Sequence, residues 1–378
     1  MDKTRNIRNE KKKTKKHKGS RFFKFIVLLA LIGTLVYFFL LNDEQRNKLK
    51  DLKKTNIEFK EVEGPKLNII DEKSKSRPVA VVYDNNTNAW PHAGLSNAYA
   101  IYEFPVEGGE SRVLAFFKDQ KDVQVGPIRS ARHYFLDYVL EHDSIFVHLG
   151  KSPQAVIDME GLRISNINGQ LYDTLRKKSN SKREFWRVFN KFRPHNAYTN
   201  MENLSNIVKE RKYKTETDTR VPFKYSAQNI NLDKDKSKKI SSLEGAYHSA
   251  NKTVFKYDEN TQKYTKTSKG IIQKDENTNK NLELKNIIIL KTEVTKLVDG
   301  ENKDRKNVKT TGSLEGIYST NGRVMDIIAK KDSRTSKTKY LDKDGNEIVF
   351  NDGITFIMIV PESDISYNYT LAQETEAK

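Results

Sequence analysis

Apolar and polar residues follow one another in segments that predict two folded regions of different composition. In the first region, short apolar runs typical of buried strands occupy positions 78–83, 98–106, 112–118 and 144–149. The second and third runs are joined by Glu-Gly-Gly-Glu at 107–110, which predicts a hairpin turn because glycine adopts positive φ at no steric cost. This region is expected to contain both strands and helices.

Three helices are expected in the same region. The first begins at Gly126, with Pro127 as its first helical residue and an apolar stripe at 3.6-residue spacing formed by Ile128, Ala131, Phe135, Tyr138 and Val139. The second covers 154–160 and is capped by Ser152, and the third begins at Asn200. The sequence therefore predicts a mixed α/β (α+β) domain over residues 77–212.

The second region has strand signals separated by polar turns and lacks a helix pattern of comparable strength. Residues 254–257 and 263–266 predict a hairpin, and the apolar runs 286–295 and 353–360 predict the strongest strands of the chain. A smaller β-rich domain is expected over 241–365. A charged linker or insertion at 213–240 precedes it, and a polar tail at 366–378 follows it.

The N-terminal part predicts a membrane anchor. The run from Phe25 to Leu41 (FIVLLALIGTLVYFFLL) has no charged residue, and a helix of this length spans roughly 25 Å. The basic tail 1–24 holds eleven Lys and Arg, which places the N-terminus in the cytoplasm and the bulk of the chain outside. Residues 42–76 are expected to form a stalk. A cleaved signal peptide and a buried core helix are the alternatives.

Composition narrows the possible functions. The 378 residues carry a formal net charge of +18 and no cysteine, which excludes disulfides, thiolate metal sites, a cysteine nucleophile and lipidation of an N-terminal cysteine. The seven histidines lack metal-ligand spacing, and neither a phosphate-binding loop nor a nucleophile elbow is present. No metal, cofactor or nucleic-acid partner is expected.

The expected helix at Gly126 carries the first candidate binding site. Arg129, Arg132 and His133 fall in its first two turns, where the helix dipole is already positive, and such a cluster favours a bound phosphate or carboxylate. The alternative is salt bridges to carboxylates of the same domain. The available groups are Glu103, Glu107 and Glu110 near the hairpin turn, with Arg112 beside them.

Catalytic candidates come from strand ends and from the turn. Asp84 and His148 each end a buried strand, and the carboxyl ends of strands in open α/β sheets are where ligands bind. Glu107 could supply acid or base chemistry for glycosidic hydrolysis. His195 is a candidate ligand contact. The alternatives are a solvated Glu107, a buried His148 with local hydrogen bonds, and a loop His195 bonded to backbone.

Several segments together resemble the YerB-like family of bacterial envelope lipoproteins, which has an N-terminal and a C-terminal domain of unknown function. The resemblance is carried by RPVAV from Arg77, Asp84-Asn85, Tyr102-Glu103, VEGG with Arg112, VGPIRSAR at 125–132, SPQA at 152–155 and RPHN at 193–196. It covers about residues 77–365. Members are typically held by a lipidated cysteine, which this chain lacks, so the resemblance implies a wall-facing location with the run 25–41 as anchor.

These observations lead to three hypotheses. The first is a membrane-anchored binding or scaffold protein for an anionic cell-wall polymer or an envelope protein, with Arg112, Arg129, Arg132, His133, Glu103 and His195 as ligand contacts. The second is a hydrolase of wall glycan or phosphodiester that uses Glu107, Asp84 or His148, and it requires these groups to share one cleft. The third is a purely structural partner of other envelope proteins. Because no recognisable catalytic constellation is present, binding is favoured over catalysis.

Overall fold

The computed structural model describes residues 66–173, 184–301, 303–363 and 365–373, all of which fall in one compact unit. The predicted cytoplasmic tail 1–24, the predicted span from Phe25 to Leu41 and stalk residues 42–65 lie outside the described residues. Within the described ranges, none of the helices combines the length and the apolar character needed to cross a membrane.

The N-terminal half of the described chain alternates strands and short helices. Its strands are β1 (Val79–Asp84), β2 (Ala100–Pro105), β3 (Ser111–Phe117), β4 (Gln124–Val125), β5 (Ile145–His148), β6 (Asn166–Asn168), β7 (Trp186–Arg187) and β8 (Ala197–Asn200). Its α-helices are α3 (Leu136–Glu141), α4 (Pro153–Gly161), α5 (Gln170–Asp173) and α6 (Met201–Glu210). The predicted mixed α/β character of this half is confirmed.

The remaining elements of the described chain are all strands, as predicted for a β-rich C-terminal domain. They are β9 (Tyr225–Ser226), β10 (Lys238–His248), β11 (Asn251–Asp258), β12 (Lys263–Ser268), β13 (Ile271–Ile272), β14 (Glu283–Leu284), β15 (Asn286–Thr292), β16 (Val294–Lys296), β17 (Lys306–Val308), β18 (Gly312–Thr320), β19 (Arg323–Lys331), β20 (Lys339–Leu341), β21 (Phe350–Asn351), β22 (Thr355–Pro361) and β23 (Tyr367–Leu371).

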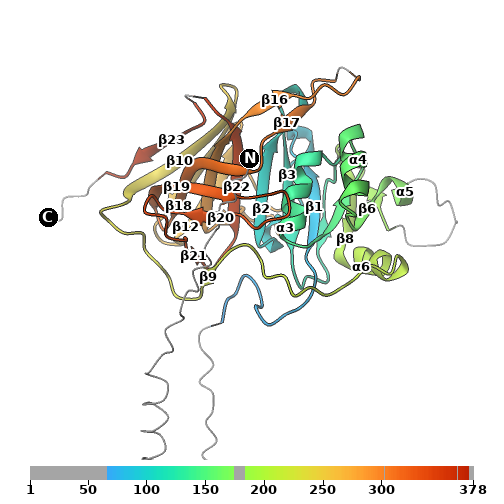
Figure 1. The fold of residues 1–378 in the computed structure, drawn as a ribbon, viewed down its shortest axis with the longest axis horizontal. Helices are drawn as coiled ribbons and strands as arrows, with labels where there is room; N and C mark the ends of the chain where they lie inside the picture. The colour runs from blue at the N-terminus through green and yellow to red at the C-terminus, as the bar shows by residue number, and fades with distance from the viewer. Residues whose placement is uncertain (1–65, 174–183, 302, 364, 374–378) are drawn as a thin grey trace, which may run out of the picture. The chain divides into compact units, whose positions relative to one another are not determined.

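One mixed sheet passes through both halves. Among the described residues it has sixteen strands, in the order β13, β12, β11, β10, β19, β18, β15, β22, β2, β3, β1, β5 and β6, with β14, β20 and β23 paired at its sides. The halves meet where β22 pairs in parallel with β2, from Ala100 opposite Thr355 to Glu103 opposite Met358 (Figure 1). The central strands are buried on both faces, which explains their continuous apolar runs.

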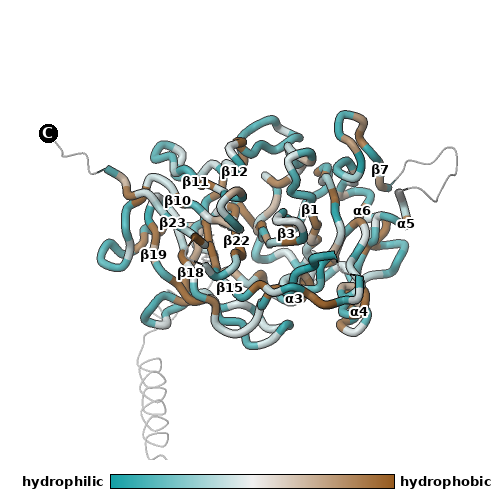
Figure 2. Tube along the Cα trace, turned by 90° about the horizontal axis from the view of Figure 1, so that it is seen from above, coloured by the Kyte–Doolittle hydropathy of each residue, from teal (hydrophilic) through white to brown (hydrophobic). Residues whose placement is uncertain are grey.

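Aromatic packing fixes the helix that covers β2. Tyr138 of α3 contacts Tyr102 with ring centroids 4.6 Å apart, and Phe135, just before α3, lies 5.1 Å from Phe104. Figure 2 shows that hydrophobic stretches follow the inner strands, whereas the peripheral loops are mostly hydrophilic. The predicted cap of α4 is also confirmed, because Ser152 accepts from the Ala155 N–H. The helix predicted to begin at Asn200 is α6, and the Asn200 side chain accepts from the Asn203 N–H.

The predicted helix at Gly126 is wrong, because residues 126–132 are extended. Their backbone groups bond to neighbouring segments: the N–H of Ile128 donates to Ala197 O (2.7 Å), and that of Arg129 donates to Val82 O (2.9 Å). Gly126 has φ +150°, and a Cβ there would lie 2.8 Å from Ala197 O, so the glycine allows close approach rather than capping a helix. The helix begins only at Leu136, after a 3-10 turn at 133–135.

The end of the predicted stalk packs against the folded body. Asp352 accepts hydrogen bonds from the backbone N–H groups of Asn68 (2.8 Å) and Ile69 (2.9 Å), and Ile70 is buried in the core. The boundary expected at Arg77 therefore misses a segment that already belongs to the compact unit.

Candidate functional site

A cleft of about 340 Å³ opens at one edge of the N-terminal half. Its lining combines five cations, Arg112, Arg129, Arg132, Lys303 and Arg305, with three carboxylates, Asp84, Glu107 and Glu110, and with His195. We call this feature the arginine cleft. It gathers residues that are up to 221 positions apart in the chain, from Asp84 to Arg305.

The sheet positions the first of these side chains. Asp84 ends β1 and lies opposite Arg112 at the start of β3, so the antiparallel register brings the carboxylate and the guanidinium to the same edge. Glu107 sits in the turn between β2 and β3, where Gly108 (φ +66°) and Gly109 (φ +69°) both adopt the positive φ expected from the sequence. The turn therefore projects Glu107 over the ends of the strands.

The extended segment that replaces the predicted helix supplies two further arginines. Hydrogen bonds attach it to the end of β1 on one side and to the end of β5 on the other: Asp84 N–H donates to Pro127 O (2.9 Å), and Leu149 N–H donates to Arg129 O (2.9 Å). Arg129 and Arg132 project from this segment into the cleft. The two arginines are brought into the cleft by the strand-like pairing of their extended segment, and not by the i, i+3 spacing of a helix.

Asp84 is the acidic centre of one side of the cleft. It is buried, and its Oδ2 lies 2.7 Å from Nδ1 of His195 and 3.1 Å from Nε of Arg129. Because a carboxylate only accepts, Nδ1 of His195 donates, which leaves Nε2 as the unprotonated nitrogen of the neutral ring. The backbone N–H of His195 donates to Phe192 O at 2.8 Å, and the imidazole contacts Asp84.

Glu107 is the acidic centre of the other side. Its Oε1 accepts from Nε of Arg132 at 2.8 Å and lies 2.6 Å from Nη2 of the same guanidinium, while Nε of Arg305 lies 3.8 Å away. Burial would raise the pKa of Glu107, but the charge and hydrogen bond of Arg132 outweigh it and lower the pKa. Glu110, across the turn, pairs instead with Lys269 at 2.9 Å.

Arg112 lies between Asp84 and Glu107 and forms an ion pair with neither. Its side chain is buried, Nη1 donates to Ser130 O at 2.8 Å, and within the described ranges no acidic side chain forms an ion pair with it. Burial, and after it the charge of Arg132, lowers the pKa of Arg112 to about 9, with Glu107 opposing the shift. The guanidinium is still charged at pH 7, so the cleft holds an uncompensated positive charge at its base.

Three predicted site residues, His148, His133 and Glu103, do not line the arginine cleft. His148 is fully buried, with Nδ1 2.8 Å from Gly150 O and Nε2 3.2 Å from Asn166 Oδ1, which is the local hydrogen bonding given as its alternative. His133 faces a different cavity and contacts Asn307 Oδ1 at 3.0 Å. The helix on which its expected proximity to Arg129 rested is absent, and the two side chains line different cavities.

Glu103 lies behind the cleft wall and not in it. It accepts from Ser111 Oγ (2.8 Å) and Asn85 Nδ2 (3.1 Å), and Lys266 Nζ lies 2.9 Å from its other oxygen. It therefore supports the residues that line the cleft, since Ser111 is among them. Sequence reasoning missed Lys303 and Arg305, which come from a charged loop of the C-terminal half where no local pattern marks a site.

The donor set does not favour a metal. Among the described residues, no group of three or more His, Asp or Glu side chains is placed to hold an ion. The cleft chemistry is dominated by guanidinium groups, whose planar donors match phosphate and carboxylate oxygens.

Two family models match the chain, the DUF3048 N-terminal domain over residues 66–214 and the DUF3048 C-terminal domain over 243–357, both described as domains of a protein of unknown function. The curated protein "Putative lipoprotein YerB" of Bacillus subtilis (strain 168) is 29% identical over 344 residues, which cover 90% of this chain and 96% of that protein. The chain belongs to the YerB-like family.

The solved structures extend this relationship to the fold. The crystal structure of YerB from Bacillus subtilis superimposes with a TM-score of 0.69 at 28% identity, covering 81% of this chain and 99% of that one. Within the YerB-like fold, the arginine cleft uses both family segments. Asp84, Arg112, Arg129 and His195 come from the first, and Lys303 and Arg305 come from the second.

Proposed function

We propose that this protein is an extracytoplasmic envelope protein that binds an anionic group, a phosphate or a carboxylate, of a cell-wall polymer in the arginine cleft. Much of the resemblance noted in the sequence comes from segments that supply this cleft: Asp84-Asn85, the EGG turn, Arg112, the 125–132 segment and RPHN. Segments far apart in sequence thus contribute polar side chains to one cleft.

The proposal includes the membrane anchor. The relative is named as a lipoprotein, whereas this chain has no cysteine to lipidate. The uncharged run from Phe25 to Leu41, next to a basic tail, is the segment that would hold the protein at the membrane, with the N-terminus in the cytoplasm and the described residues outside. A protein partner in the envelope is an alternative occupant of the same cleft.

The buried and unpaired Arg112 is the observation that carries the proposal. Asp84 balances Arg129, and Glu107 balances Arg132, so Arg112 is the guanidinium that an incoming anion would neutralise. A hydrogen bond to a charged group contributes about 1.5–3 kcal/mol, which corresponds to roughly a tenfold to hundredfold change in affinity.

The test compares the full chain with Arg112→Gln. Binding of glycerol 3-phosphate by calorimetry, and retention of the protein on purified cell wall, are both expected to weaken at least tenfold in the variant. Lys256→Gln, which removes an exposed charge on β11 outside the cleft, is the matched control and should bind like the parent chain. Equal binding by Arg112→Gln and the parent would refute the anion site.

A second candidate function is hydrolysis of a phosphodiester, favoured by the pair of His195 and Asp84. His148, the base named in the sequence hypothesis, does not line the cleft, whereas His195 does and is oriented by Asp84 at 2.7 Å. His195 Nε2 would take a proton from water as the water oxygen bonds to phosphorus. The bond between phosphorus and the leaving oxygen would break, and the His195 imidazolium would give that proton to the leaving alkoxide.

This candidate is tested with bis(p-nitrophenyl) phosphate. Release of p-nitrophenol by the full chain, and its loss in His195→Gln with anion binding retained, would support hydrolysis. Absence of product from the parent chain, under conditions where it binds glycerol 3-phosphate, would leave binding as the function.

A further inference from the structure

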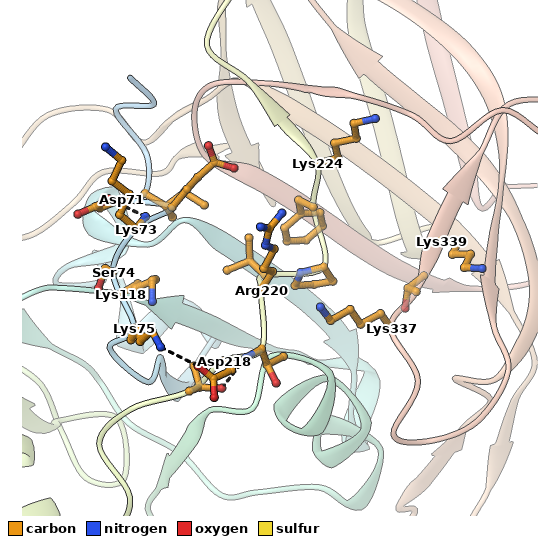
Figure 3. A pocket seen from close by; sticks show the side chains of 18 of the residues that line it. Asp71, Lys73, Ser74, Lys75, Lys118, Asp218, Arg220, Lys224, Lys337 and Lys339 are labelled. Atoms are coloured by element: carbon orange, nitrogen blue, oxygen red, sulfur yellow. Dashed lines mark hydrogen bonds and ion pairs between the residues drawn. The ribbon is translucent and has the colours of Figure 1, made fainter. Parts of the chain in front are cut away.

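A second and larger cavity, of about 480 Å³, lies away from the arginine cleft and shares no lining residue with it. It is formed by residues 70–75, by Lys118 after β3, by the connection 217–224 between α6 and β9, and by residues 337–339 with Glu347 (Figure 3). We call it the lysine pocket. Its walls thus come from both halves of the compact unit and from the connection between them.

The floor of the lysine pocket is apolar and firmly packed. Pro222 and Phe223 are buried, and the ring of Phe223 stacks on Tyr340 at 5.9 Å and meets the edge of Phe350 at 5.3 Å. Ile70 is also buried and completes the apolar surface. A ligand in this pocket would therefore contact hydrocarbon as well as charge.

The rim is cationic. Seven Lys and Arg side chains line the pocket, against four Asp and Glu. Lys75 pairs with Asp218 at 3.2 Å, but among the described residues Arg220, Lys337 and Lys339 form no ion pair. In Figure 3, Lys337 extends toward the segment that carries Arg220, near the middle of the pocket.

Buried hydrogen bonds anchor the segment that carries Lys337 and Lys339. Thr338, between Lys337 and Lys339, is buried, and both its N–H (3.1 Å) and its Oγ1 (2.7 Å) donate to Glu141 Oε2. Glu141 is itself paired with the buried Lys331 at 2.7 Å. Thr338 comes directly before β20, and Lys337 and Lys339 on either side of it are exposed.

The two central cations influence one another. The pKa of Lys337 is lowered, first by burial and next by the charge of Arg220. An anion placed between the two side chains would relieve this repulsion.

We infer that the lysine pocket binds an amphiphilic anion, in which a phosphate or carboxylate is joined to an apolar group. Arg220 and Lys337 would hold the anionic group, and the surface of Pro222 and Phe223 would receive the apolar part. The volume falls within the usual range of about 300–1,000 Å³ for small-molecule sites. This chemistry is that of a lipid phosphate, which can come from a bilayer or from a soluble amphiphile.

The test measures binding of dihexanoyl phosphatidic acid, a water-soluble amphiphile, to the full chain by calorimetry. Two companion probes separate the contributions: inorganic phosphate lacks the apolar part, and dihexanoylglycerol lacks the charge. We expect each companion to bind at least tenfold more weakly than the amphiphile. The double variant Arg220→Gln/Lys337→Gln should lose at least tenfold in affinity for it, and because both side chains are exposed it is expected to fold.

Controls keep this site distinct from the arginine cleft. Lys256→Gln removes an exposed charge elsewhere and should bind the amphiphile like the parent chain. Because the arginine cleft is itself proposed to bind phosphate, the three probes and the double variant are also compared in the Arg112→Gln background, where binding in that cleft is weakened. Phosphatidic acid in phosphatidylcholine vesicles is the bilayer arm, and a tenfold loss by the double variant there would identify a membrane source. In the Arg112→Gln background, unchanged binding of both the soluble amphiphile and the vesicles by the double variant would overturn the inference, as would equal binding of phosphate and amphiphile.

Discussion

The buried pair of Glu103 and Lys266 offers a direct test of how the cleft is supported. Their side chains are 1% and 3% exposed, the charged atoms lie 2.9 Å apart, and the pair connects β2 of the first half with β12 of the second. The substitution Lys266→Met keeps a side chain of similar length but removes the cation. Glu103 then stays buried next to neutral donors, among them Ser111 and Asn85.

The magnitude follows from the distance. At 2.9 Å and an effective dielectric of ~20, the attraction of two unit charges is roughly 6 kcal/mol. The net loss of stability is smaller than this attraction, because removing the lysine also removes the cost of taking its charge out of water. Breaking a buried pair by removing one partner usually costs about 3–5 kcal/mol. At roughly 2 °C per kcal/mol for a unit of this size, Lys266→Met should lower Tm by about 6–10 °C.

The assay is urea unfolding of the full chain followed by tryptophan fluorescence. Trp90 reports on the same network, since its Nε1 donates to Asn85 Oδ1 at 3.0 Å and Asn85 contacts Glu103. Lys256→Met on the exposed side of β11 is the control and should change stability by less than about 0.5 kcal/mol. The double variant Glu103→Gln/Lys266→Met should recover at least half of the loss. A loss below about 1 kcal/mol for Lys266→Met alone would refute the reasoning.

Three further predictions concern the backbone and the buried histidine. Gly126→Ala should destabilise the fold by more than about 2 kcal/mol and weaken glycerol 3-phosphate binding, because its Cβ would lie 2.8 Å from Ala197 O; full stability in urea would contradict this. Asn200→Ala should cost about 1 kcal/mol by removing the cap of α6, measured by the shift in urea midpoint. Burial lowers the pKa of His148 in the folded chain to about 4, whereas in the unfolded chain it is about 6.5. Between these pH values the unfolded chain binds a proton that the folded chain does not, so about 3 kcal/mol of stability is lost as the pH falls from 6.5 to 4. His148→Gln should flatten this dependence, and an unchanged slope would show that other groups cause it.

The strands were predictable because their apolar runs are local. The expected strands at 78–83 and 112–118 correspond to β1 and β3 within one or two residues, Ser152 caps α4 as expected, and α6 begins next to Asn200. In each case the decisive information lies within a few neighbouring residues. Burial on both faces of a central strand requires a continuous apolar run, whatever the rest of the chain does.

The extended segment 126–132 was not predictable in the same way. Its apolar spacing fits a helix, but partners remote in sequence, at Val82 and Ala197, take its backbone hydrogen bonds. Six of the candidate site residues nevertheless line one cleft, and their role in binding a ligand stays a prediction: Asp84, Glu107, Arg112, Arg129, Arg132 and His195. His148 and His195 could not be distinguished, because only the tertiary fold decides which imidazole meets Asp84.

The pairing of β2 with β22 makes the two family segments inseparable at the level of the backbone. If the chain were cut between them, the N–H and C=O groups of β2 that face β22, and those of β22 that face β2, would both lose their partners. Each fragment would then present a long apolar strand with an open edge, which is a template for pairing with other chains. Proteolysis in the connection at 215–242 would therefore leave two fragments that either stay joined or aggregate, and neither would be an independent module.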